Sequence, residues 1–149
     1  MSEVDEDEVY SPSDDELVEL YGRIKTIAVV GASDDVAKAA SRIPRYLKNQ
    51  GYTIIPVNPR GGTIIGEEAK ASLAELDAPP DVVDVFRPSE ETPDVARAAV
   101  AAGAKVLWLQ EGISNDEARK IAEDAGLTVI MNRCMGATHA QLGLGPGPG

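Results

Sequence analysis

The chain has 149 residues, 43% of them apolar, and a formal net charge of −11 at pH 7. This length fits one domain, since domains cluster near ~100–150 residues. Its uncharged apolar runs are far shorter than the ~20 residues of a membrane helix, and its acidic N-terminus is unlike a signal peptide. One cysteine and one histidine exclude an internal disulfide and a cysteine-type zinc site. We therefore expect a cytoplasmic protein.

The negative charge is concentrated at the start of the chain. Nine of the 25 acidic residues lie in positions 1–20, which contain no Lys or Arg, so the remainder has 16 acidic against 14 basic residues. We expect residues 1–22 to form an acidic, flexible segment, with an interaction arm or an adaptation to high salt as alternatives. No basic face stands out in the remainder, which disfavours binding to nucleic acid but leaves room for a single nucleotide.

From residue 23 onward, short β-branched runs alternate with helical patterns, which is typical of a parallel α/β sheet. We expect strands at residues 24–30, 52–57, 63–65, 81–86, 105–109 and 127–131. We expect helices at residues 37–50, 92–103, 114–126 and 137–142, a small one capped by Ser72, and a flexible Gly/Pro tail at residues 143–149.

Two helix starts carry specific signals. Pro44 fits the first turn of its helix, where a missing N–H costs nothing, so regular helix is expected from about Ile43. Ser114 and Glu117 have the spacing of a capping box. The whole pattern predicts a single-domain α/β fold with a Rossmann-type doubly wound parallel sheet of five to six strands, in the order 3-2-1-4-5-6.

A ligand is expected beyond the carboxyl ends of the strands, where the strand order reverses and the Gly31–Ser33 loop faces Phe86 and Arg87. Gly31 suits a phosphate-binding turn, although Ser33 and Val36 stand where a dinucleotide fingerprint requires glycine.

The end of the second expected strand discriminates between nucleotides. Asn58 replaces the acidic residue that usually binds the ribose of NAD, and Arg60 suits an additional ribose phosphate, as in NADP or coenzyme A (CoA). The sequence therefore disfavours NAD.

Residues 24–142 resemble the stand-alone CoA-binding domain family, whose fold is that of the N-terminal domain of the succinyl-CoA synthetase alpha subunit. The matching pieces are Ala28-Val-Val-Gly-Ala-Ser33, Ser41-Arg42, Ile55-Pro-Val-Asn-Pro59, Asp81-Val-Val-Asp-Val-Phe-Arg87, Val106-Leu-Trp-Leu-Gln110 with Gly112, and Asn132-Arg-Cys134. Together with Arg60, which suits the additional ribose phosphate, the resemblance implies these CoA-binding residues: Gly31, Ala32, Ser33, Ser41, Arg42, Val57, Asn58, Pro59, Arg60, Phe86, Arg87, Gln110, Gly112, Asn132 and Cys134.

Several of these residues also have a purely structural interpretation. Ser41 suits a helix cap, Arg42 and Arg87 suit surface cations, and Phe86, like Trp108, suits the core. Cys134 is either an accessible thiol near the ligand or a buried one. His139 fits a polar surface position better than a general base, because no partner for it can be named.

No catalytic or metal-binding constellation emerges from the sequence. The favoured interpretation is a protein that binds CoA or an acyl-CoA without catalysis of its own. An NADP-dependent oxidoreductase domain and a non-catalytic subunit of an acyl-CoA-handling enzyme are the alternatives, and a protein partner or homo-oligomer stays open.

Overall fold

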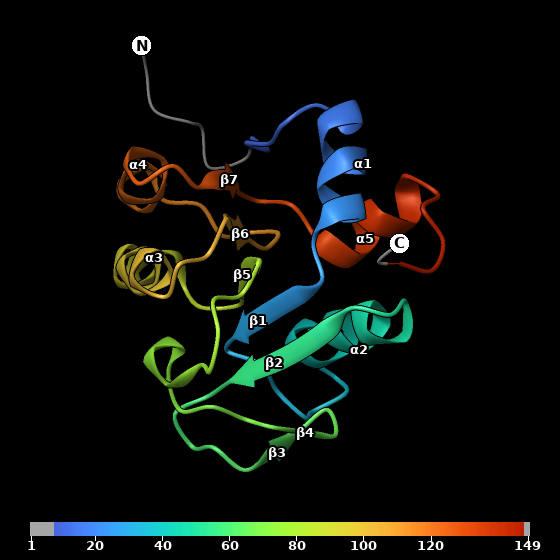
Figure 1. The fold of residues 1–149 in the computed structure, drawn as a ribbon, viewed down its shortest axis with the longest axis vertical. Coiled ribbons are helices and arrows are strands. Elements are labelled where there is room, and N and C mark those ends of the chain that lie inside the picture. Colours follow the sequence, from blue (N-terminus) through green and yellow to red (C-terminus); the bar gives the residue numbers. More distant parts are fainter. Residues whose placement is uncertain (1–7, 148–149) are drawn as a thin grey trace.

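The computed structural model describes residues 8–147, in which five parallel strands lie between two layers of helices (Figure 1). In spatial order the strands are β2 (Thr53–Val57), β1 (Thr26–Val30), β5 (Val82–Val85), β6 (Val106–Leu109) and β7 (Thr128–Ile130). Every residue of β5 and β6 is buried, as expected for central strands covered on both faces. The predicted single-domain, Rossmann-type α/β fold is confirmed.

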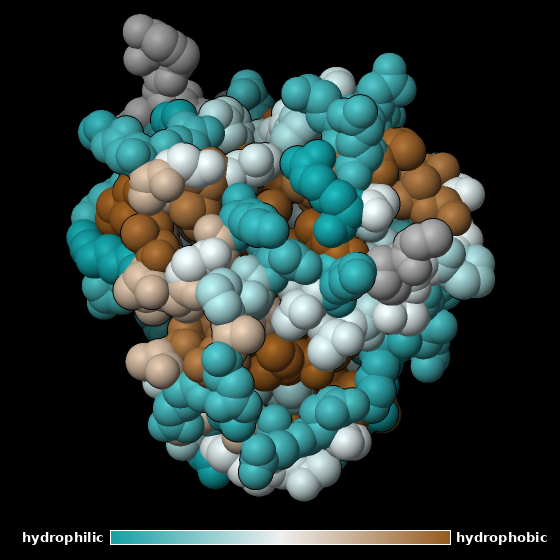
Figure 2. All heavy atoms as spheres, viewed as in Figure 1, coloured by the Kyte–Doolittle hydropathy of each residue, from teal (hydrophilic) through white to brown (hydrophobic). Residues whose placement is uncertain are grey.

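The helices divide between the two faces of the sheet. One layer contains α1 (Asp14–Arg23), α2 (Ala39–Asn49) and α5 (Met135–Gln141), and the other contains α3 (Thr92–Ala101) and α4 (Asp116–Asp124) (Figure 1). Two short 3-10 helices, η1 (Leu73–Glu75) and η2 (Ser89–Glu91), lie in the connections. Trp108 is fully buried under the first layer, as its core interpretation predicted. On the face in Figure 2, most of the surface is hydrophilic and hydrophobic residues show in separate patches.

The expected third strand does not join the main sheet. β3 (Thr63–Ile64) pairs antiparallel with β4 (Glu67–Glu68) in a separate ribbon, so the predicted order 3-2-1-4-5-6 is wrong in its first position. Pro56 explains why β2 stays at the edge. The Pro56 carbonyl faces the outer side of β2, where it accepts from the Lys70 N–H at 2.9 Å. Because proline has no N–H, this side of β2 lacks a donor that a sixth strand would need.

The N-terminal segment differs from the expected flexible region. α1 starts in a capping box between Ser13 and Glu16, and Leu17, Leu20 and Tyr21 on its inner face are 0–2% exposed. The dense acidic charge concealed this apolar face, whose members recur at helical spacing. The segment expected to be flexible therefore contains the docked helix α1 from Asp14 onward, and residues 1–7 lie outside the described part.

Several local expectations also need correction. The N-cap of α4 is Asn115, whose side chain accepts from the Ala118 N–H at 2.9 Å, and not Ser114. α2 begins at Ala39 and contains Pro44 in its interior. The expected tail makes contacts as well, because Leu144 packs against the core and the Gly147 N–H donates to the Gln50 carbonyl at 2.6 Å.

Candidate functional site

A cleft of about 790 Å³ opens at the carboxyl ends of β1, β2 and β5. Its lining includes nine residues expected from the sequence to bind the ligand: Gly31, Ala32, Ser33, Val57, Asn58, Pro59, Arg60, Phe86 and Arg87. The lining also includes the α2 cap Lys38, Ala40 from α2, Leu73 from η1, and Val95 and Ala98 from α3. The cleft therefore lies where the strand order reverses, as expected for this sheet.

The floor of the cleft depends on Gly31. Its φ is +88°, and a Cβ at this position would lie 2.9 Å from the Phe86 carbonyl oxygen and 3.0 Å from Arg87 Cδ. The Phe86 N–H donates to the Val30 carbonyl at 2.9 Å, which holds the two chain segments together. The structure thus brings the Gly31 loop against Phe86 and Arg87, and only glycine fits this approach without a shift of the backbone.

The loop between β1 and α2 is fixed by its own polar side chains. The Asp35 N–H donates to Ser33 Oγ at 3.0 Å, and the Ala37 N–H donates to the Asp35 carboxylate at 3.0 Å. Arg42 Nη1 donates to the carbonyls of Val36 and Ala37, at 3.1 and 2.6 Å. Arg42 therefore holds the loop in place and does not line the cleft.

Asn58 fastens the opposite wall of the cleft. Its Nδ2 donates to the Ala32 carbonyl at 3.2 Å, and its Oδ1 accepts from the Arg60 N–H at 2.9 Å. The side chain thereby ties the end of β2 to the Gly31 loop and shapes the turn that presents Arg60. Asn58 occupies the place of the acidic ribose ligand of NAD sites, and here it has a structural task.

Charges of both signs line the cleft. Lys38, Arg60 and Arg87 contribute three cations, and Glu91 and Asp94 contribute two carboxylates. The Glu91 carboxylate accepts from Arg87 Nε at 3.0 Å and from Arg87 Nη2 at 2.9 and 3.0 Å. Asp94 pairs instead with Arg97 at 2.7 Å. The lining therefore suits a ligand that is negative where the three cations meet it and apolar toward Leu73 and Val95.

The other six expected site residues lie outside this cleft. Ser41, expected as a cap or a ligand contact, is buried within α2 and accepts from Arg45 Nε at 2.9 Å. Arg42 braces the loop before α2. The remaining four, Gln110, Gly112, Asn132 and Cys134, follow β6 and β7.

This second group is tied together at the start of α5. Asn132 Oδ1 accepts from the Gly112 N–H at 2.6 Å, and Cys134 Sγ accepts from the Ala137 N–H at 3.4 Å as the cap of α5. Gln110 Oε1 accepts from the Met135 N–H at 3.3 Å. Cys134 is half-buried, so its thiol is neither fully accessible nor fully buried, the two states expected from the sequence.

Asp84 is a buried carboxylate that the sequence reasoning did not single out. It lies in the middle of β5, fully buried, and accepts from Gln110 Nε2. Its Oδ2 has no hydrogen-bond partner among residues 8–147. Burial raises the pKa of Asp84 to about 7, although the Gln110 hydrogen bond opposes the shift. An acidic residue within the apolar run Val82–Val85 was the available signal.

His139 is buried, contrary to the expected surface position. It is 1% exposed, its ring lies 5.4–5.8 Å from the rings of Tyr21, Tyr46 and Tyr52, and its Nδ1 is 2.9 Å from the Tyr46 hydroxyl. Burial lowers the pKa of this imidazole. The single histidine is thus a core residue of the layer that contains α1, α2 and α5.

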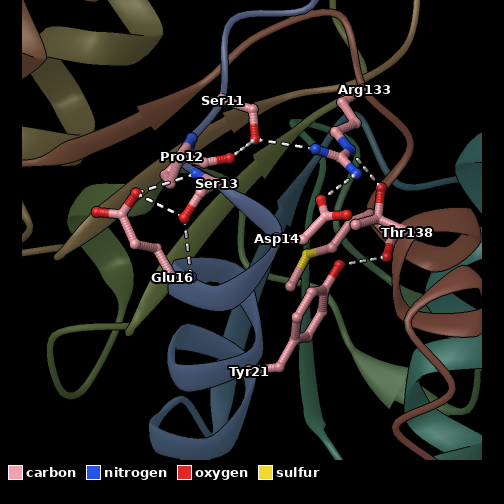
Figure 3. Close-up of polar contacts among 9 residues, drawn as sticks. Ser11, Pro12, Ser13, Asp14, Glu16, Tyr21, Arg133 and Thr138 are labelled. Carbon is pink, nitrogen blue, oxygen red and sulfur yellow. Dashed lines mark hydrogen bonds and ion pairs between the residues drawn. The ribbon is translucent and has the colours of Figure 1, made fainter.

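The N-terminal segment adjoins the second group through Arg133 (Figure 3). Arg133 donates to Ser11 Oγ at 3.1 Å and to Thr138 Oγ1 at 3.0 Å, and it lies 3.5 Å from the Asp14 carboxylate. The Tyr21 hydroxyl donates to the Met135 carbonyl at 2.6 Å. These contacts connect the start of α1 to the start of α5, beside Cys134.

The sequence profile described as a CoA binding domain matches residues 25–140, which include the whole cleft and the second group. The chain belongs to the CoA binding domain family. Within this family it is 42% identical over 130 residues to the uncharacterized protein YneT of Bacillus subtilis (strain 168), and the match covers 87% of this chain and 96% of YneT.

Solved structures share the same arrangement. The structure of cell-free ID.343 from Thermus thermophilus has a TM-score of 0.84 and 42% identity, covering 88% of this chain and 99% of that chain. A hypothetical protein from Pyrococcus horikoshii OT3 has a TM-score of 0.85 and 36% identity, covering 88% of this chain and 92% of that chain.

A longer protein also contains a similar segment. ADP-forming acetate–CoA ligase I of Archaeoglobus fulgidus is 25% identical over 130 residues, which is 80% of this chain but 19% of the ligase.

Residues 8–147 contain no group of three or more His, Cys, Asp or Glu side chains arranged to hold a metal ion. Their helices are all too short or too polar to cross a membrane.

Proposed function

We propose that this member of the CoA binding domain family binds coenzyme A, or an acyl-CoA, in the cleft at the carboxyl ends of β1, β2 and β5. The observation that carries the proposal is the close packing of Gly31 against Phe86 and Arg87 at the point where the strand order reverses. The cleft volume of about 790 Å³ lies within the range of small-molecule sites, roughly 300–1,000 Å³.

The residues of the cleft fit the parts of CoA. The loop from Gly31 to Ser33 and the Arg87 guanidinium would receive the diphosphate, since backbone N–H groups and arginine are good phosphate donors. The apolar side chains of Leu73 and Val95 would flank the adenine, and Arg60 would meet the ribose 3′-phosphate. In this proposal Gly112, Asn132 and Cys134 of the second group lie toward the pantetheine end, and Gln110 supports them from the core.

Calorimetry with the full chain tests the ligand. We expect CoA to bind more tightly than NAD, because Asn58 replaces the acidic ribose ligand, and dephospho-CoA to bind more weakly than CoA, because Arg60 loses its phosphate. NAD binding as tightly as CoA would overturn the proposal. Mass spectrometry of small molecules released from the purified, denatured protein gives an independent readout of the natural ligand.

The NADP alternative is tested in the same titration. Arg60 suits the 2′-phosphate of NADP as well as the 3′-phosphate of CoA. Preferential binding of NADP over CoA would favour an oxidoreductase-type domain and would contradict the CoA assignment.

A role as the non-catalytic subunit of an acyl-CoA-handling enzyme is a second candidate. It is favoured by the likeness to about a fifth of an ADP-forming acetate–CoA ligase. In that case the chain would co-purify with a larger acyl-CoA ligase component at native levels, together with CoA. Elution as a stand-alone species that carries CoA would contradict this role and leave the binding function intact.

A further inference from the structure

The ion pair between Arg87 and Glu91 suggests how ligand affinity is set. Arg87 is the cation that follows β5, and its Cδ lies 3.0 Å from the position a Gly31 Cβ would occupy, so its side chain crosses the floor of the cleft. Glu91 ends η2, at the N-terminal end of α3, and lines the same cleft. Both side chains are 46% exposed, so a ligand can reach them.

The Glu91 carboxylate already makes the contact that a phosphate would make. Its oxygens accept from Arg87 Nε and Nη2 in a forked arrangement at 2.9–3.0 Å. A phosphate uses the same planar fork when it binds arginine with two hydrogen bonds. The carboxylate and a phosphate cannot both occupy this edge of one guanidinium.

We propose that Glu91 is an internal competitor for Arg87: it holds the guanidinium in the ligand-free protein, yields it to the diphosphate of the ligand, and recaptures it on release. This inference rests on the proposed function, and it makes Glu91 a residue that sets the affinity and the release rate of CoA. An exposed ion pair of this kind contributes little stability, so a diphosphate with two negative charges can displace it. The competition weakens ligand binding by the free energy needed to break the Arg87–Glu91 ion pair.

The test is a double-mutant cycle with CoA as the probe. Glu91→Gln keeps the size and polarity of the side chain but removes the charge, and we expect it to bind CoA about two- to fivefold more tightly, which corresponds to breaking an exposed ion pair. The rate of CoA dissociation, measured by stopped-flow mixing, should fall by a similar factor. In the Arg87→Ala background, Glu91→Gln should make no further difference.

Glu90→Gln is the matched control. Glu90 is the exposed neighbour of Glu91 in η2 and does not line the cleft, so its removal changes the net charge equally without releasing Arg87. An equal gain in Glu90→Gln, or a gain of Glu91→Gln that persists without Arg87, would show a general charge effect and overturn the inference. Weaker binding by Glu91→Gln would show that Glu91 positions Arg87 for the ligand. If the wild-type chain does not bind CoA, the proposed function fails first.

Discussion

The carboxylate of Asp84 in β5 accepts a hydrogen bond from the amide of Gln110, which follows β6, and both side chains are buried. Gln110 in turn accepts from the Met135 N–H at the start of α5. The network connects the centre of the sheet to the segment that begins with Asn132. Gln110, which the family resemblance implied as a ligand contact, thus has a structural partner on each side.

Asp84 makes stability depend on pH. Its pKa is about 7 in the folded protein against 3.8 ordinarily, so the folded state binds the proton more tightly. The resulting stabilisation is fully present below pH 3.8 and is lost as the pH rises through 7. Asp84→Asn should therefore raise the free energy of unfolding at pH 8, by at most about 4 kcal/mol at about 1.36 kcal/mol per pKa unit.

Urea unfolding of wild type and Asp84→Asn at pH 5 and pH 8 measures this effect. Asp94→Asn, which changes an exposed carboxylate, serves as the control. The expected result is a smaller difference between the two pH values in Asp84→Asn alone. Equal pH dependence in Asp84→Asn and wild type would mean that the carboxylate does not hold its proton at neutral pH.

His139 should titrate below the ordinary histidine pKa of 6.5, because burial disfavours the imidazolium. For a lowered pKa, the unfolded state binds the proton first, so this group costs stability as the pH falls below 6.5. Its effect opposes that of Asp84, whose stabilisation grows as the pH falls. Because it is the single histidine of the chain, an NMR titration reads it directly. A pKa at or above 6.5 would contradict its burial among the tyrosines.

The docking of α1 predicts contrasting effects at two adjacent positions. Leu17 is fully buried and Val18 is 42% exposed. Leu17→Ala should reduce the free energy of unfolding by about 2–5 kcal/mol, the usual range for a buried leucine, whereas Val18→Ala should change it by less than about 0.5 kcal/mol. Denaturant titration of both variants measures this difference. If both variants lost equally little free energy of unfolding, residues 14–22 would be flexible, as their charge led us to expect.

Gly31→Ala should weaken CoA binding and destabilise the fold. The new Cβ meets the Phe86 carbonyl oxygen at 2.9 Å, in addition to the strain of a φ of +88°. Gly126→Ala separates these causes, because Gly126 has a φ of +91° and no atom within 4 Å of its Cβ position. We expect both variants to lose about 1–2 kcal/mol from strain. Gly31→Ala should lose more and should alone lose CoA affinity, as thermal unfolding and calorimetry can show.

The sequence by itself determined the βα rhythm, the parallel sheet and the place of the cleft. These follow from local patterns: β-branched runs, capping residues and glycines mark the elements, and the right-handed crossover rule arranges them. The juxtaposition of Gly31 with Phe86 and Arg87 was predictable for the same reason, since both segments leave neighbouring parallel strands at the same edge.

The tertiary structure alone decided how the polar side chains divide between scaffold and cleft. Arg42, Ser41 and Gln110 have the right chemistry for a ligand contact, but each meets a partner within the fold. The Asp84 partner of Gln110 is 26 residues away in the sequence. Arg42 and Ser41 have local partners, in the loop before α2 and within α2. The apolar face of α1 was readable at helical spacing, but the dense acidic residues around it outweighed it in the composition. Burial of Asp84 and His139 arises from neighbours on other elements, and burial sets their pKa values.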